Sequence, residues 1–196
     1  PISWGLTKIN ADDVWTLGYT GSGVVVGGQD TGYEWEHPAP KDKYRGWNGI
    51  TATHNYNWYD AAGHSVATPQ LTPFDDYGHG THTMGTMAGN DLASNQPGWP
   101  SAATNAIGVA PGADLQLGSF NSFESMTAAT KQAMSVGAIV QNNSWGYDIT
   151  FSQRTYERVF GSPEGKAYIS SLRDLAKGSV IVFSASNIEG NTKADL

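Results

Sequence analysis

The chain has 196 residues, of which 39% are hydrophobic and 15% are charged, and these proportions are typical of a globular protein with a single core. Its net charge of −7 argues against a nucleic acid as partner, and no apolar run approaches the roughly 18 residues that a membrane-spanning helix needs. Cysteine is absent, which excludes disulfides, thiol nucleophiles and zinc sites built on cysteine.

In chain order, apolar runs predict four β-strands. The first, over residues 23–29, has β-branched residues at consecutive positions, as in a strand buried on both faces. The others cover residues 114–118, 138–141 and 179–184. After the first strand, the segment from Glu34 to Tyr77 is rich in Trp, Tyr, Asn, Gly and Pro and has weak periodicity. We predict that it forms a long surface excursion with a short hairpin.

Two helical patterns lie between the later strands. Residues 123–137 carry apolar side chains at spacings of three and four, which gives one continuous face. Ser162 and Pro163 are typical of a helix start, and the pattern ends at Lys177 and Gly178. The predicted inward residues of this second helix are Ala167, Tyr168, Leu172, Leu175 and Ala176. Buried strands that alternate with helices predict an α/β fold with a mostly parallel β-sheet and helices on both faces.

The carboxyl ends of parallel strands meet at one edge of a sheet, and functional residues gather beyond that edge. Asp30 closes the first predicted strand, Asn143 and Ser144 close the third, and Ser186 and Asn187 close the fourth. We therefore expect these residues to lie along one edge, although they are far apart in the sequence.

His79 opens the most informative stretch of the chain, a run of small residues over 79–89 that is typical of a tightly packed helix. Gly78 and Gly80 flank the histidine and allow close backbone approach. A serine nucleophile needs a neighbouring base, and that base needs a carboxylate to hold its tautomer. Taken singly, Asp30 is better explained as a helix cap and His79 as a satisfied polar residue. Together, in this order, they predict the acid and the general base of a serine hydrolase, hydrogen-bonded through the imidazole Nδ1.

His82 lies three residues after His79 and raises the alternative of a metal site. Zinc sites on a helix more often use a spacing that places both imidazoles on one face, with a glutamate nearby as base. No glutamate lies near this pair, although Asp75 and Asp76 could supply oxygen ligands. The pattern therefore favours nucleophilic catalysis over metal catalysis.

Two segments at strand ends offer hydrogen-bonding groups to a substrate. Asn187 follows the last predicted strand, where a side-chain amide is suited to donate to a developing oxyanion; the alternative is an ordinary turn asparagine. Ser144, Trp145 and Gly146 follow the third strand and offer backbone groups with which an extended peptide can pair as an added strand.

These motifs resemble those of the subtilisin-like serine peptidases, the subtilases. Asp30 within residues 26–32 is similar to the aspartate motif of the family, His79 within 79–82 to its histidine motif, and residues 107–113 to a further signature. The resemblance implies that Asp30 orients His79, that His79 is the general base, and that Asn187 lies in the oxyanion hole. It also implies a set of substrate-binding residues, which are Ser144, Trp145, Gly146, Ser184, Ala185 and Ser186.

The resemblance further implies a secreted bacterial endopeptidase that is made with a propeptide and acts on polypeptides. It implies no cofactor for the chemistry and, often, a structural calcium ion. The loop from Asn90 to Asn105 differs in length from the family pattern, so the usual calcium ligands do not carry over, and Asn90 and Asp91 are candidates only. Ser186 stands where the family usually has glycine, so we expect a P1 pocket that is narrower or has a shifted wall.

The family's Gly-Thr-Ser-Met-Ala segment, which holds the nucleophilic serine, has no counterpart in residues 1–196. We therefore expect them to be the N-terminal portion of a single peptidase domain, with a sheet that is incomplete at its C-terminal side. The leading expectation is a nick after Leu196, with the serine on a second, non-covalently bound chain; a truncated chain is the alternative. Two other functions stay open: a non-catalytic binding or inhibitory module, and a carbohydrate-binding surface that uses the Trp and Tyr residues between Trp35 and Tyr59.

Overall fold

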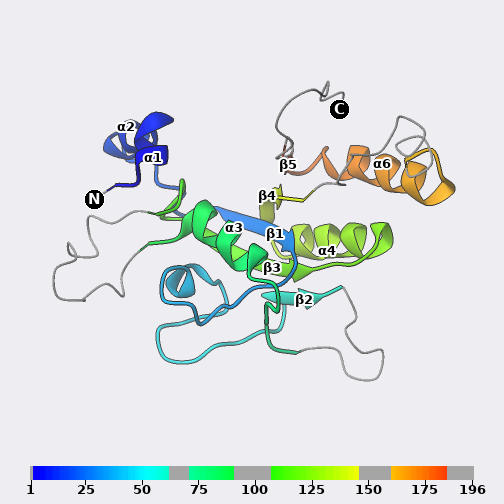
Figure 1. Ribbon diagram of the computed structural model, residues 1–196, viewed down its shortest axis with the longest axis horizontal. Coiled ribbons are helices and arrows are strands. Elements are labelled where there is room, and N and C mark those ends of the chain that lie inside the picture. The colour runs from blue at the N-terminus through cyan, green and yellow to red at the C-terminus, as the bar shows by residue number, and fades with distance from the viewer. Residues whose placement is uncertain (1, 62–70, 91–106, 146–159, 185–196) are drawn as a thin grey trace.

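A parallel β-sheet organises the molecule. The computed structural model describes residues 2–61, 71–90, 107–145 and 160–184, and Figure 1 shows how their elements are arranged. In these ranges the sheet has five strands, and every neighbouring pair is parallel. In spatial order the strands are β2 (Trp58–Asp60), β3 (Asp114–Ser119), β1 (Val25–Asp30), β4 (Ala138–Asn143) and β5 (Val180–Phe183). The predicted α/β class with a parallel sheet is confirmed.

Helices cover both faces of this sheet. The described helices are α1 (Trp4–Lys8), α2 (Ala11–Thr16), the 3₁₀ helix η1 (Lys41–Lys43), α3 (His79–Ala88), α4 (Phe123–Ser135) and α6 (Pro163–Leu175). Successive strand residues point to opposite faces, so the two glycines of β1 show which helix lies on which side. A side chain on Gly27 would meet Ala133 of α4, whereas one on Gly28 would meet Met87 of α3. The lack of side chains at both positions lets two helices approach the central strand.

The core lies between the sheet and α3. Its buried apolar residues come from β1, β2, β3, α3 and the loops between them; they are Val26, Tyr33, Trp35, Tyr44, Trp58, Met84, Ala88, Ala113, Leu115 and Leu117. Burial of this surface holds the strand that ends in Asp30 against the helix that begins with His79. The core therefore fixes the relative position of the two segments that carry the predicted acid and base.

The described parts of the segment from Glu34 to Tyr77 form a surface excursion only in part, because three of their aromatic residues are buried although Tyr56 and Tyr77 are exposed. Trp35 is 8% exposed, Tyr44 1% and Trp58 6%. Trp58 also begins β2, which pairs with β3 in parallel rather than in a hairpin. Within the described residues of this segment, the antiparallel pairing is one isolated bridge, between Trp47 and Ala52.

The predicted start of α6 at Ser162 is confirmed, and α4 begins at a serine cap that was not predicted. The Ser122 hydroxyl accepts the Ser125 N–H at 3.1 Å and begins α4, and the Ser162 hydroxyl accepts the Gly165 N–H at 3.0 Å and begins α6. These contacts satisfy amide groups that have no partner within the first turn of a helix. The helix over α4 ends at Ser135, two residues before the predicted end.

The inward face predicted for α6 is narrower than expected. Tyr168 is buried, whereas Leu172 and Leu175 are half-buried and Ala167 and Ala176 are exposed. The reason is that α6 packs chiefly on α4, above which it lies in Figure 1. A helix that contacts one other helix buries a thinner stripe than a helix that lies on a sheet.

Two short helices precede the sheet and were not predicted. In Figure 1 α1 and α2 stand to one side of the strands, and the Trp15 indole N–H of α2 donates to the Val109 carbonyl at 3.0 Å. Within the described ranges, no helix combines the length and the apolar character needed to cross a membrane.

Candidate active site

Asp30 is a buried carboxylate at the carboxyl end of the central strand. It is 2% exposed, and β1 delivers it to the same edge as Ser119, its neighbour on β3. Its Oδ1 accepts the N–H of Thr31 at 2.7 Å, and its Oδ2 accepts the hydroxyl of Thr83 at 3.3 Å. A buried carboxylate needs such donors because burial removes its hydration. The surroundings therefore hold Asp30 in one orientation.

His79 is the first residue of α3, and its ring meets Asp30. The imidazole Nδ1 lies 2.6 Å from Oδ1 of the carboxylate. A carboxylate oxygen can only accept, so Nδ1 carries the proton and donates it to Asp30. The His79 side chain is 41% exposed, and within the described residues its only hydrogen bond is to Asp30. The predicted pairing through Nδ1 is present, and it leaves Nε2 free to take a proton.

The two glycines that flank His79 have different roles at the start of α3. A side chain on Gly80 would fall on the Gly32 carbonyl oxygen and close to the Asp30 Cβ, so the backbones touch there. Gly78 has φ +83 and open space around it, so its role is conformational: it supplies a left-handed turn before the helix. The close approach predicted at both positions is confirmed at Gly80 and is wrong at Gly78.

Asp75 joins the two segments through five hydrogen bonds. Its Oδ1 accepts the Thr31 hydroxyl at 2.9 Å and the backbone N–H groups of Gly78 and Tyr77 at 2.9 and 3.2 Å. Its Oδ2 accepts the backbone N–H and the hydroxyl of Thr81 at 2.9 and 2.6 Å. Desolvation raises the pKa of Asp75, but these donors outweigh it, and the pKa lies below its ordinary value of 3.8.

The ends of β4 and β5 bring together three of the residues predicted to bind substrate. The Ser184 N–H donates to the Asn143 carbonyl at 3.0 Å, and the Ser184 hydroxyl donates to the Trp145 carbonyl at 3.2 Å. Ser144 exchanges hydrogen bonds with Asn142, whose partner in the register of β1 is Gly28. This group therefore lies at the same sheet edge as Asp30.

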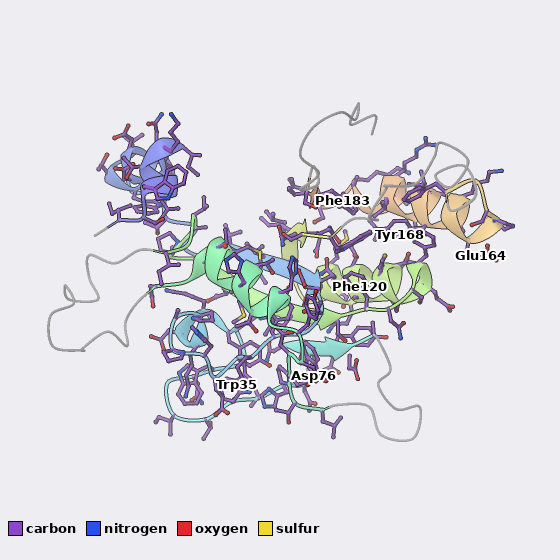
Figure 2. The ribbon with its side chains drawn as sticks, in the orientation of Figure 1. Trp35, Asp76, Phe120, Glu164, Tyr168 and Phe183 are labelled. Atoms are coloured by element: carbon purple, nitrogen blue, oxygen red, sulfur yellow. The ribbon has the colours of Figure 1, made fainter. Side chains whose placement is uncertain are left out.

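The Trp145 ring lies in an aromatic cluster. Phe120, Tyr168 and Phe183, labelled in Figure 2, have ring centroids 5.2, 6.2 and 5.3 Å from that of Trp145. Gly146, Ala185, Ser186 and Asn187 lie outside the described residues, so their predicted roles in substrate and oxyanion binding stay predictions.

The described residues offer no three-ligand metal site. No group of three or more His, Asp or Glu side chains is placed there to hold an ion, and both oxygens of Asp75 are engaged by protein donors. Asn90, a candidate calcium ligand, has a buried Oδ1 without a hydrogen-bond partner in these ranges. An amide oxygen of this kind fits the oxygen shell that Ca²⁺ prefers. Asp91, the second candidate, lies outside the described residues.

Of the Trp and Tyr residues proposed as a carbohydrate surface, Trp35, Tyr44 and Trp58 are buried and Trp47 is half-buried, whereas Tyr56 and Tyr59 are exposed. Trp35 packs against Tyr44, Trp47 and His54, with ring centroids 5.4 to 5.7 Å apart. Lys41 lies over the Trp47 ring at 4.3 Å from its centroid. A sugar cannot stack on rings that already pack on one another, so this cluster is part of the core.

Comparison with known proteins identifies the family of this chain. The sequence model of the subtilase family matches residues 21–196. The chain belongs to this family. The predicted resemblance to the subtilases is confirmed.

Three relatives show how much of a subtilase is present. Bacillopeptidase F from Bacillus subtilis (strain 168) is 44% identical over 115 residues, which cover 57% of the chain and 7% of that protein. Minor extracellular protease Vpr from the same organism is 33% identical over 144 residues, 70% of the chain and 16% of the relative. Subtilisin DY from Bacillus licheniformis is 28% identical over 188 residues, 95% of the chain and 55% of the relative. The chain thus spans little more than half of one relative and far less of the other two.

The motifs in the sequence identify Asp30 and His79 but not the residues that hold them in place. Asp75 was predicted only as a possible oxygen ligand for a metal, whereas its carboxylate accepts amide N–H groups at the start of α3. The available signal was an aspartate four residues before His79, followed by the turn-forming Gly78, which is typical of a side chain that satisfies the first turn of a helix. Its contact with Thr31, 44 residues earlier, has no such local signal.

Proposed function

We propose that this chain provides the acid and base of a serine endopeptidase that acts on polypeptides. The observation that carries the proposal is the 2.6 Å contact between His79 Nδ1 and the buried Asp30 carboxylate, with the His79 side chain 41% exposed. Membership of the subtilase family supports the same chemistry. Secretion is part of the proposal, supported by the similarity to a relative named as an extracellular protease.

In the proposed mechanism, His79 Nε2 takes the proton from a serine hydroxyl as that oxygen attacks the scissile carbonyl carbon. The proton makes His79 an imidazolium, which the Asp30 carboxylate stabilises through the Nδ1–H hydrogen bond. His79 then gives the proton to the leaving amine, and a water molecule repeats the sequence on the acyl-enzyme. In this proposal the serine comes from polypeptide outside these 196 residues, because they contain no counterpart of the family's Gly-Thr-Ser-Met-Ala segment.

The remaining predicted residues have assigned roles in this proposal. Asn187 donates its amide to the oxyanion of the tetrahedral intermediate. The backbone at residues 144–146 pairs with the extended substrate, and residues 184–186 line the P1 side. The chemistry needs no cofactor. A calcium ion at the loop that begins with Asn90 would be structural, with the Asn90 side-chain oxygen as one ligand.

The test uses the complete protein as produced by its source, with peptide hydrolysis and labelling by a fluorophosphonate as measurements. His79→Ala should lower kcat by roughly 10⁴-fold or more and abolish labelling, because base and nucleophile act as a unit. The matched control is His82→Ala, since His82 is an exposed histidine on the same helix. Its activity should stay near that of the wild type.

The outcomes separate this proposal from its rivals. A protein that neither hydrolyses peptides nor reacts with the fluorophosphonate would indicate a non-catalytic binding or inhibitory module. An activity that depends on His82 as much as on His79, and that a chelator removes, would indicate metal catalysis instead.

A further inference from the structure

Asp75 lies where two loops meet, one after the acid and one before the base. The Tyr33 N–H donates to the Phe74 carbonyl at 2.7 Å, which ties the loops side by side next to Asp75. The carboxylate then bonds to Thr31, the residue after Asp30, and to Thr81, the second residue after His79. Asp75 therefore contacts a near neighbour of each member of the pair.

Thr31 links Asp75 by hydrogen bonds to Asp30 and to the backbone beside His79. Its backbone N–H donates to Asp30 Oδ1 at 2.7 Å, and its hydroxyl donates to Asp75 Oδ1 at 2.9 Å. The same hydroxyl accepts the Gly80 N–H at 3.1 Å, next to His79. One threonine thus connects the acid, the backbone beside the base, and Asp75.

Asp75 also replaces the missing cap of α3. The helix begins after Gly78, which has no side chain with which to accept the first amide groups. Asp75 accepts the N–H of Gly78 and of Thr81 instead, and a negative charge at that position interacts favourably with the helix dipole. A turn at φ +83 followed by an uncapped helix would otherwise leave His79 on a loosely held end.

From these contacts we propose that Asp75 is a positioning residue for the acid–base pair, acting through Thr31 and Thr81. This inference rests on the proposed peptidase function for its kinetic consequence, but its geometric content does not. Proton transfer depends on sub-ångström placement, and a displacement of about 1 Å in a catalytic group can cost about 100-fold in rate. Asp75 is thus expected to affect turnover without contacting the substrate or the reacting atoms.

The test compares variants of the complete protein in three measurements: kcat and KM for a peptide, the NMR signal of the His79 Nδ1 proton, and thermal unfolding. Asp75→Ala should lower kcat by about tenfold or more with KM within about twofold of the wild type. It should also weaken or broaden the Nδ1 proton signal, because the hydrogen bond to Asp30 becomes less uniform. Asp76→Ala is the matched control, since Asp76, labelled in Figure 2, is the exposed neighbouring aspartate.

A second pair of variants tests the route through Thr31. Thr31→Val removes the hydroxyl that Asp75 and Gly80 share and should reproduce the loss in kcat, whereas Thr31→Ser keeps the hydroxyl and should restore it. Thr31 is exposed, so these substitutions do not disturb the core. Should Asp75→Ala not fold, Asp75→Asn and the Thr31 pair carry the same comparison.

Different results overturn different claims. If Asp75→Ala or Asp75→Asn lowers the unfolding temperature but leaves kcat and the Nδ1 signal as in Asp76→Ala, Asp75 is only a helix cap and the positioning role is wrong. The same conclusion follows if Thr31→Val behaves like Thr31→Ser. If the wild type has no peptidase activity, the proposed function fails, and the Nδ1 proton signal alone decides whether Asp75 orders the pair.

Discussion

At Gly80 a missing side chain allows the helix that carries the base to touch the strand end that carries the acid. Its backbone packs on the Gly32 carbonyl, and its N–H donates to the Thr31 hydroxyl at 3.1 Å. A methyl group here has no flexible neighbour to push aside, because the obstructing atom belongs to the backbone. The separation of Asp30 and His79 is thus set by backbone contact as much as by their own hydrogen bond.

This contact predicts the effect of Gly80→Ala. The added carbon should force α3 away from β1, lower the free energy of unfolding by about 1–3 kcal/mol, as overpacking does, and lower kcat as the pair separates. Gly85→Ala is the matched control, since nothing lies within 4 Å of a side chain at Gly85 on the same helix. It should be neutral or stabilising by about 0.5–1 kcal/mol, because alanine is the better helix former. Chemical denaturation and peptide hydrolysis measure both; a Gly80→Ala protein that matches Gly85→Ala would contradict the contact.

The role proposed for Asn187 makes a separate prediction. If its amide donates to the oxyanion, Asn187→Ala should lower kcat by roughly 100- to 1000-fold, or about 3 kcal/mol, with little change in KM, a magnitude known for removal of an oxyanion-hole donor in a subtilisin. Steady-state kinetics on one peptide substrate suffices. A large rise in KM with kcat intact would assign Asn187 to substrate binding instead.

At the scale of elements, the loop from β1 to β2 is held by an aromatic cluster with a histidine at its edge. The Tyr44 hydroxyl lies 2.9 Å from His54 Nδ1, and the rings stack at a centroid distance of 5.8 Å. Burial lowers the pKa of His54 below its ordinary value of 6.5, against an opposing effect of the Glu36 carboxylate. The folded protein therefore favours the neutral imidazole.

The lowered pKa predicts how the stability of this cluster depends on pH. The unfolded chain binds the His54 proton at a higher pH than the folded protein does, so the contribution is complete above 6.5 and is lost as the pH falls through the folded pKa. Urea unfolding between about pH 8 and pH 5 should show a decline that is smaller in His54→Gln. An unchanged decline in that variant would assign the pH dependence to other groups.

How far these elements could be predicted depended on whether their signal was local. Residues 25–30 and 114–119 form strands where apolar runs predicted them, and Ser162 begins a helix as its residue type indicated. The three residues of β2 contain no such run, and they form a strand because β3 offers an unpaired edge. Likewise Asp30 and His79 belong to recognisable motifs, whereas the Asp75–Thr31 contact arises only when the sheet brings two loops together.

At the scale of the whole molecule, the two sides of the sheet differ in how well they are covered. The central strand β1 lies between α3 and α4, but on the β4–β5 side Ile139, Val180 and Val182 are 52%, 61% and 46% exposed. Within the described residues, β5 pairs with β4 alone. Parallel sheets are normally covered on both faces, and an uncovered strand edge recruits further chain. These exposed residues support the proposal that more polypeptide packs here, as does the 55% share of Subtilisin DY that the chain spans.

The composition of the active protein tests this proposal. Denaturing mass spectrometry of peptidase purified from its source should show either one chain longer than these 196 residues or two polypeptides, of which the one labelled by a fluorophosphonate is not this one. A paired Val180→Lys and Val182→Lys variant should weaken packing of that additional polypeptide, because two ammonium groups would be placed at the interface without partners. Its activity should fall while Tyr56→Lys, a change at an exposed aromatic residue away from β5, keeps activity. A single species of 20.9 kDa that is folded and hydrolyses peptides would refute the proposal, because it would have to contain its own nucleophile.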